Sequence, residues 1–195
     1  QTCALPICKA GTVGLPLPGV EIQIVDDQRQ PLNGDGIGNI EVRGKNVFSG
    51  YWHLPDKTAE SFSEDGWFAT GDQGTIDDDG YLHIVGRSKD MVITGGLNVY
   101  PKEIEQAIDK LPGVVESAVF GVPHADFGEA VTAAIVIGGD GTPETGEMLK
   151  ALKSELASYK VPKQLLVLEQ LPRNAMGKVQ KNVLRQRYVD LFDGQ

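Results

Sequence analysis

The sequence GRSKDMVITGGLNVYPKEIE, residues 86–105, combines four local signals that an ordinary surface connection does not need together. A charged turn leads into a short apolar strand, and Gly95-Gly96 follow that strand. Pro101 then begins a helix whose first turn carries Glu103 and Glu105, near the positive end of the helix dipole. We therefore predict that this stretch joins two domains and forms part of a functional site.

Upstream of this stretch, the sequence predicts short strands connected by tight turns. Residues 20–25, 39–43 and 81–85 alternate apolar and polar side chains, which is the period of a half-buried strand. The Asn and Gly residues within 33–36 tolerate the positive φ that tight turns require. Residues 55–62 begin with a proline and predict a brief helix. The upstream part is therefore expected to form a small antiparallel β sheet or a segment of a barrel.

Downstream of Asp90 the pattern changes to alternating helices and strands. Apolar periodicity predicts helices over residues 101–111, 147–159 and 182–191. Residues 114–122 and 130–137 are almost continuously apolar or β-branched, which is typical of central strands, and residues 165–168 predict a third strand. The expected fold class is therefore α+β, in which the β-rich part precedes a compact C-terminal domain with helices on one side of a three-stranded sheet.

Composition excludes several classes of protein. The 195 residues carry a formal net charge of −9, which argues against a wide nucleic-acid-binding or anionic-membrane surface. No apolar run approaches the ~18 residues of a membrane-spanning helix. Cys3 and Cys8 lie together near the N-terminus without a His or acidic partner at ligand spacing, so we expect reduced thiols in a cytoplasmic protein and no metal site. The first residue is Gln1, and we expect the protein to begin far upstream.

Three short patterns contain candidate ligand-binding residues, and each has an ordinary structural alternative. Asp72 follows a Thr-Gly turn, and its carboxylate can accept both hydroxyls of a ribose, although by itself it more simply closes a hairpin. Arg87, fifteen positions later, offers a fork of donors to ribose or phosphate, or else forms a surface ion pair. Gly95 and Gly96 allow close approach of a ligand, or else make a turn.

A fourth pattern is the basic loop around Lys178. Residues 171–181 contain Pro, Asn and Gly, and Lys178 follows the glycine directly. Between Tyr159 and Tyr188 the one acidic residue, Glu169, stands against seven basic residues: Lys160, Lys163, Arg173, Lys178, Lys181, Arg185 and Arg187. This local inversion of sign suits a polyanionic small ligand such as a nucleotide or pyrophosphate. The alternative is a solvated basic face.

Together and in this order, the patterns resemble the later core motifs of the adenylate-forming superfamily, which includes acyl-CoA synthetases, peptide-synthetase adenylation domains and luciferases. The residues that carry the resemblance are 38–44 with 50–52, 70–72, 86–105 and 172–185. It extends over about residues 9–188, and Asn39 stands where the family usually has Glu. Within the superfamily the chain is most similar to malonyl-CoA synthetases, because of residues 93–105, 121–129 and 172–182.

The resemblance implies a reaction in two halves: ATP-dependent formation of an acyl-adenylate, then transfer of the acyl group to CoA. It implies that Lys178 is the catalytic residue and contacts ATP or AMP together with Asp72 and Arg87. It further implies that Lys89 is the hinge of a mobile domain. The residues implied for CoA binding are Gly95, Gly96, Phe127, Tyr159 and Lys163, while Val161 replaces an Arg that some relatives use there.

The resemblance also predicts the domain boundaries and the partners. Residues 1–9 are unmatched, residues 10–88 would end a large N-terminal AMP-binding domain, and residues 89–195 would form its C-terminal mobile lid. The phosphate loop, the acid pocket and the ligands of the implied Mg²⁺ would lie upstream, in a missing N-terminal part, so that this segment by itself would be inactive. Malonate, ATP and CoA are the expected partners, with no nucleic acid and no membrane.

Two alternatives to a malonate–CoA ligase remain at this point. One keeps the enzyme class and changes the acid or the acceptor, as in a medium-chain or methylmalonyl-CoA synthetase. The other is a non-catalytic, stand-alone C-terminal module that docks on a partner through its basic loop.

Overall fold

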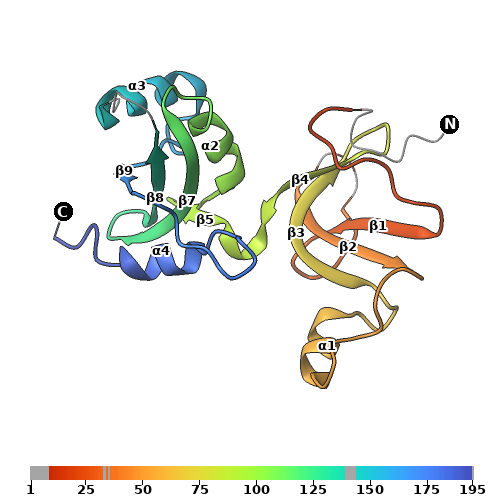
Figure 1. Cartoon of the computed structure of the whole chain (residues 1–195). Helices are drawn as coiled ribbons and strands as arrows, with labels where there is room; N and C mark the ends of the chain where they lie inside the picture. The colour runs from red at the N-terminus through yellow and green to blue at the C-terminus, as the bar shows by residue number, and fades with distance from the viewer. Residues whose placement is uncertain (1–8, 33, 35, 139–143, 195) are drawn as a thin grey trace. The chain divides into compact units, whose positions relative to one another are not determined.

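The computed structural model describes residues 9–32, 34, 36–138 and 144–194 (Figure 1). The chain divides into two compact units, Gln1–Lys89 and Asp90–Gln195. Within the described residues, no helix is both long and apolar enough to cross a membrane. The expected loop over residues 138–146 lies largely outside the described residues.

The first unit is built on one antiparallel sheet in the order β1-β2-β3-β4. Its strands are β1 (Val20–Val25), β2 (Gly38–Gly44), β3 (Phe68–Ile76) and β4 (Leu82–Arg87), and helix α1 (Pro55–Ser61) connects β2 to β3. Ile24, Ile40 and Leu82 form its buried core, because alternate residues of each strand point to the same face. In the described part of the unit, the four strands form an open antiparallel sheet and not a closed barrel, in agreement with the small antiparallel sheet or barrel segment that the sequence predicted.

The second unit is an α+β module, as the sequence predicted, but its sheet has five strands and not three. Strands β5 (Val92–Thr94), β6 (Leu97–Val99), β7 (Val114–His124) and β8 (Gly128–Ile137) are antiparallel in the order β6-β5-β8-β7. Strand β9 (Gln164–Val167) pairs with β8 in parallel. The sequence predicted the short strand before Gly95, which is β5, but did not place it in this sheet, and it did not predict β6 as a strand. A strand of three residues is too short to show a two-residue period.

Helices cover both faces of this sheet, whereas the sequence predicted helices on one side only. Helices α2 (Pro101–Ile108) and α3 (Thr145–Glu155) pack over one face, in a core that includes Ile104, Ile108 and Leu152. Helix α4 (Lys181–Arg187) packs over the other face, where Leu184 contacts the core around Phe120. Alternate residues of β7 and β8 enter the two cores, and both faces are apolar, so the strands read as continuous apolar runs.

The helices of the second unit are shorter than the sequence predicted. Helix α3 ends at Glu155, and Leu156 is already extended, with φ −110° and ψ 149°. Tyr159 therefore lies in a turn that the Lys160 amide closes on the Ala157 carbonyl, at 2.9 Å, and not on the helix predicted over residues 147–159.

Candidate active site

Asp72 lies inside strand β3, at a bulge, and not at a turn that closes a hairpin. Residues 70–72 of β3 oppose Ile40 alone on β2, and Gly71 has a φ of +77°. The Thr70 hydroxyl donates to the Ile40 carbonyl at 2.8 Å and accepts from the Asp72 amide at 3.1 Å. A bulge re-aims the side chains beside it, and here it turns the Asp72 carboxylate toward β4.

Arg87 on β4 is the direct cross-strand neighbour of Asp72. Its Nε lies 2.9 Å from Asp72 Oδ1, and the two side chains are 52% and 26% exposed. Arg87 thus forms the surface ion pair that the sequence allowed as its structural alternative. The same contact places the Asp72 carboxylate, an acceptor, beside the donors of the Arg87 guanidinium. A vicinal diol needs acceptors for its two hydroxyl protons and donors for its oxygens, so this pair has the groups to bind a ribose.

Lys178 lies on a tight hairpin that its own sequence makes. Asn174 closes this hairpin. Its side-chain Oδ1 accepts hydrogen bonds from the backbone amides of Met176 and Lys178 at 3.0 and 2.9 Å, and its backbone amide donates to the Lys178 carbonyl at 2.9 Å. Gly177 has a φ of +78°, which favours glycine. An asparagine side chain that accepts hydrogen bonds from backbone amides two and four residues later fixes the turn locally. At the tip of this turn, Met176 is 77% exposed and Lys178 is also exposed.

The basic run around Lys178 is mostly neutralised by carboxylates from other elements. Four of its seven cations form ion pairs: Lys160 with Glu103, Arg173 with Glu116, Lys181 with Glu105, and Arg185 with Asp90. Two more lie over aromatic rings, Lys163 over Phe127 and Arg187 over Tyr188. Across the described residues, no hydrogen bond or ion pair involves the Lys178 ammonium. Of the three cations in the described loop 171–181, Arg173 and Lys181 are thus paired with carboxylates, and the Lys178 ammonium remains available.

Gly95 and Gly96 form the two-residue turn between β5 and β6, with φ values of +57° and +79°. Two successive residues of positive φ are typical of the turns that connect twisted hairpin strands. A Cβ at Gly95 would meet only Phe127 Cδ1, at 3.9 Å, and one at Gly96 would meet nothing within 4 Å. The backbone conformation, and not crowding inside this unit, is what requires glycine at these positions.

The structure brings three of the residues implied for CoA together. The Gly95 amide donates to the Phe127 carbonyl at 2.9 Å, and the Lys163 ammonium lies 4.5 Å from the centre of the Phe127 ring. Tyr159 is 39% exposed, and its ring faces the Lys160 ammonium at 5.7 Å. In the described part of the unit, Tyr159 makes no hydrogen bond or ring contact with Phe127 or Gly95.

Sequence reasoning missed Glu129, which attaches the glycine turn to the sheet. Its Oε2 accepts the Ile93 amide of β5 at 2.8 Å, where β5 and β8 share a single register pair. A Cβ at Gly121 would lie 2.6 Å from Glu129 Oε1, so the absence of a side chain at Gly121 leaves room for this carboxylate. The spacing of Gly121 and Glu129 carried no recognisable signal, because the two meet only across the β7–β8 pair.

Lys89 is exposed and lies in a 3-10 turn, η2 (Ser88–Asp90), at the end of the first unit. The next residue, Asp90, belongs to the second unit and lies 3.3 Å from Arg185 of α4. A short turn that ends one compact unit is the kind of segment that can absorb a change in φ and ψ.

The marked pKa shifts of the first unit lie apart from Asp72 and Arg87, at the turn between β3 and β4. A hydrogen bond from the Lys9 ammonium at 2.7 Å and one from His83 at 2.9 Å hold the pKa of Asp77 well below its usual range. Asp77 and Asp79 in turn raise the pKa of Lys9. This cluster attaches Lys9 to the turn between β3 and β4.

A metal centre does not fit the described part of the chain. Nowhere in that part do three or more His, Cys, Asp or Glu side chains come together in a group able to hold an ion. We therefore derive no step through the Mg²⁺ that the superfamily implies.

The family of this chain follows from its sequence matches. Residues 103–178 match the family described as AMP-binding enzyme C-terminal domain, and residues 2–52 match the one described as AMP-binding enzyme. The chain therefore belongs to the adenylate-forming superfamily of AMP-binding enzymes, as its motifs predicted. The second match begins at residue 2 and so includes most of the first nine residues, which the motifs left unmatched.

Particular relatives are CoA ligases and synthases named for different acids. A malonate–CoA ligase of Arabidopsis thaliana is 44% identical over 187 residues, and a feruloyl-CoA synthase of an Amycolatopsis species is 42% identical over 181 residues. These alignments cover 90% and 92% of this chain but 30% and 36% of the relatives. The ATP-bound crystal structure of MatB from Rhodopseudomonas palustris is 55% identical over 94% of this chain and 37% of its own, with a TM-score of 0.88. The chain thus spans about a third of the length of these relatives.

Proposed function

We propose that this chain is the C-terminal part of an ATP-dependent acid–CoA ligase. Such an enzyme joins a carboxylic acid to the α-phosphate of ATP, releasing pyrophosphate, and then transfers the acyl group to the thiol of CoA, releasing AMP. The observation that carries the proposal is Lys178, the cation without a carboxylate partner on an ordered, described hairpin, in a chain that also pairs Asp72 with Arg87. The named relatives support the same class of reaction.

In the first half-reaction, Lys178 is the catalytic residue. Negative charge builds on the phosphate oxygens as the acid attacks, and a positioned cation stabilises that charge more in the transition state than in the substrate. Lys178 can serve because protein carboxylates neutralise most of its basic neighbours but leave its own ammonium exposed. Asp72 and Arg87 would hold the ribose of the same nucleotide.

In the second half-reaction, the turn at Gly95 and Gly96 would lie beside the pantetheine of CoA. The exposed backbone of the turn lacks side chains, and the Phe127 ring next to Gly95 supplies an apolar surface for the pantetheine. Lys163, which is exposed and lies over that ring, offers a cation to the nucleotide phosphates of CoA, and Tyr159 a ring to its base.

The two half-reactions would use the second unit in two orientations, with Lys89 as the hinge. The ATP-bound and apo structures of MatB support this: they match this chain at the same 55% identity but with TM-scores of 0.88 and 0.70. Because the sequence is the same, the two forms of MatB differ in conformation over the matched residues. A hinge at a single exposed turn is the simplest source of such a difference.

The acid that we propose is malonate. Similarity to the Arabidopsis thaliana ligase supports malonate, but the feruloyl-CoA synthase is almost as similar, with 42% against 44% identity to this chain. Acid selection therefore belongs to residues outside this chain. Assaying the in-frame gene product that carries this chain with malonate, methylmalonate, acetate and octanoate tests the choice, and equal rates with all four would refute malonate.

A chimera tests the reaction itself. Residues 10–195 would replace the corresponding part of MatB, a protein whose ATP-bound chimeras with BxBclM have 54% and 55% identity to this chain. We expect the chimera to release AMP only when both malonate and CoA are present. In the Lys178→Ala chimera, adenylation should fall about 10²- to 10³-fold, while a supplied malonyl-adenylate should still be converted to the thioester. A folded chimera that binds ATP but releases no AMP would instead favour the non-catalytic module.

A further inference from the structure

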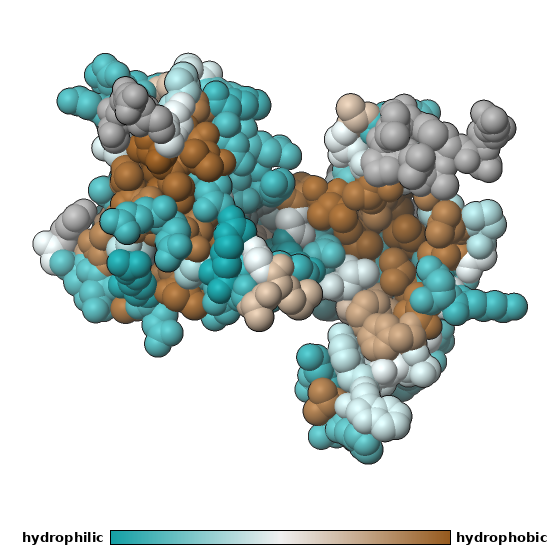
Figure 2. Space-filling model, in the orientation of Figure 1, coloured by the Kyte–Doolittle hydropathy of each residue, from teal (hydrophilic) through white to brown (hydrophobic). Residues whose placement is uncertain are grey.

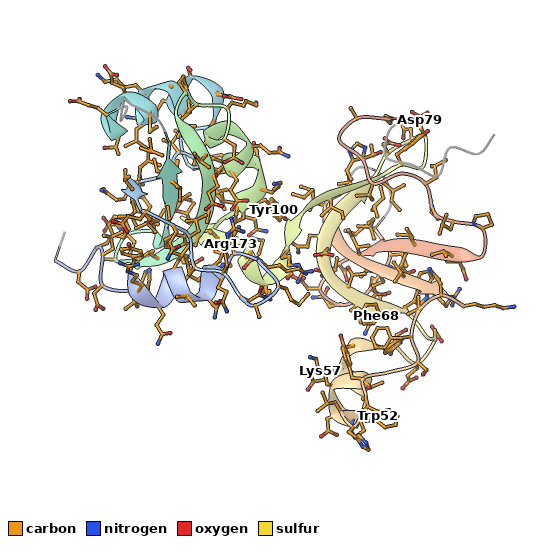
Figure 3. All side chains as sticks on the ribbon, in the orientation of Figure 1. Trp52, Lys57, Phe68, Asp79, Tyr100 and Arg173 are labelled. Atoms are coloured by element: carbon orange, nitrogen blue, oxygen red, sulfur yellow. The ribbon has the colours of Figure 1, made fainter. Side chains whose placement is uncertain are left out.

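Arg173 connects the Lys178 hairpin to the central sheet. Its Nη1 donates to the Gly177 carbonyl at 2.6 Å, and its Nη2 donates to Glu116 Oε2 on β7 (Figure 3 labels Arg173). One rigid guanidinium thus bonds to the residue directly before Lys178 and, at the same time, to a strand. A planar fork of donors can make both bonds in one geometry, whereas an ammonium is a single point charge.

The other hydrogen bonds of the described hairpin do not connect its tip to the sheet. Asn174 closes the turn on itself, and the Gln180 amide donates to the Pro172 carbonyl at 2.8 Å, again within the hairpin. The chain is anchored at the two ends of the hairpin, where Leu171 is 3% exposed and the Lys181 ammonium lies 2.6 Å from Glu105. The tip is not packed, since Met176 is 77% exposed. Across the described residues, Arg173 is therefore the side chain that bonds the tip of the hairpin to the sheet.

We propose that Arg173 and Glu116 act as a positioning pair for Lys178, an inference that rests on the proposed role of Lys178 in adenylation. The stem of Lys178 is long and flexible, so the position of its ammonium depends on where its backbone is held. A displacement of about 1 Å in a reacting group can cost about 10²-fold in rate. The pair would act only in adenylation, because thioester formation does not use Lys178.

The test is a double-mutant cycle in the ligase chimera of residues 10–195 with MatB. Arg173→Ala and Glu116→Ala should each slow adenylation about 10- to 10²-fold through kcat, with the KM for ATP and the conversion of supplied malonyl-adenylate unchanged. The double variant should be no slower than the slower single variant, because the two side chains act as one unit. Arg187→Ala is the matched control, since it removes a cation of the same run that lies over the Tyr188 ring, and it should adenylate at the parent rate.

The outcomes separate this inference from the proposed function. If Lys178→Ala slows adenylation but Arg173→Ala and Glu116→Ala do not, the positioning pair is wrong and the function stands. Additive losses in the double variant, or an equal loss in Arg187→Ala, would also overturn the pair. If Lys178→Ala itself leaves adenylation intact, the proposed function is wrong.

A second measurement on the 195-residue chain needs no activity. In Arg173→Ala, the amides of Met176 and Lys178 should exchange with solvent about two- to tenfold faster by NMR, the range that one net hydrogen bond accounts for. The amides of β7 and β8 should keep their parent rates, which shows that the unit is still folded. Unchanged exchange at Lys178 with β7 and β8 intact would overturn the proposal.

Discussion

Glu105 offers the sharpest test of how the second unit is held together. Glu105 lies on α2, is 9% exposed, and its Oε1 accepts the Val119 amide at 2.9 Å and the Lys181 ammonium at 2.6 Å. Val119 is completely buried on β7, an edge strand of the described sheet. Glu105→Ala therefore leaves a buried amide without its acceptor and an ammonium, 17% exposed, without its carboxylate.

The structure gives the size of the effect. An unsatisfied buried donor costs about 1–3 kcal/mol. The lost ion pair adds about 1 kcal/mol, between the ~0–1 kcal/mol of an exposed pair and the ~3–5 kcal/mol of a broken buried one, because both partners keep some solvent. We expect Glu105→Ala to lower the free energy of unfolding of the second unit by about 3 kcal/mol. Glu105→Gln keeps an acceptor oxygen for Val119 and should lose about 1 kcal/mol.

Hydrogen exchange resolved by segment measures this loss. A decrease of about 3 kcal/mol makes the slowest amides of β7 and β8 exchange about 10²-fold faster. Trp52 and Trp67 both lie in the first unit, so tryptophan fluorescence follows that unit as an internal control and should not change. Equal losses in Glu105→Ala and Glu105→Gln would refute the reasoning, because the Val119 bond would then contribute nothing.

Three further predictions concern the turns. Because Lys9 and His83 hold the pKa of Asp77 low, Asp77 stabilises the first unit at pH values above its unfolded pKa of about 4 and loses that effect progressively at lower pH. Asp77→Asn should therefore flatten the decrease of the Tm at acid pH, measured by fluorescence. A decrease equal to that of the parent would contradict this prediction. Gly96→Ala should destabilise the second unit by about 1 kcal/mol in chemical denaturation, because φ is +79° at this position and no atom obstructs a Cβ. Gly96→Asn should cost less, because asparagine adopts positive φ more readily than alanine. Equal costs for the two variants would mean that φ is not the cause. In the chimera, Lys89→Pro should slow thioester formation more than adenylation by fixing φ at the hinge, with Lys89→Ala as control, and equal losses would place the hinge elsewhere.

The surface of the first unit is partly hydrophobic. Figure 2 shows hydrophobic residues at the surface of this unit, and Val13, Leu15 and Leu17 are 46%, 43% and 53% exposed. Exposed apolar side chains that lie close in sequence are typical of surfaces that another part of an assembly covers. This agrees with relatives about three times as long as the chain.

Much of the fold was predictable from local sequence. The strand expected over residues 20–25 is β1, because alternating apolar and polar side chains reflect the two faces of a half-buried strand. The strands expected over 114–122 and 130–137 lie within β7 and β8, because strands covered on both faces read as continuous apolar runs. The turn at Gly95 and Gly96 was also open to prediction, since positive φ is a property of the residue itself. The adenylate-forming motifs that define the family are likewise contiguous runs of sequence.

Only the tertiary structure decided which charges remain available. Along the sequence, the basic run from Lys160 to Arg187 meets one acid, whereas in the fold carboxylates from α2, β7 and the turn η2 neutralise four of its cations. The partners are far apart in the chain, 57 positions for Arg173 and Glu116 and 95 for Arg185 and Asp90, so no local pattern could reveal them. The sequence by itself determined that Lys178 follows a glycine on a loop. That its ammonium is left exposed while its neighbours are paired depends on ion pairs, which form through space.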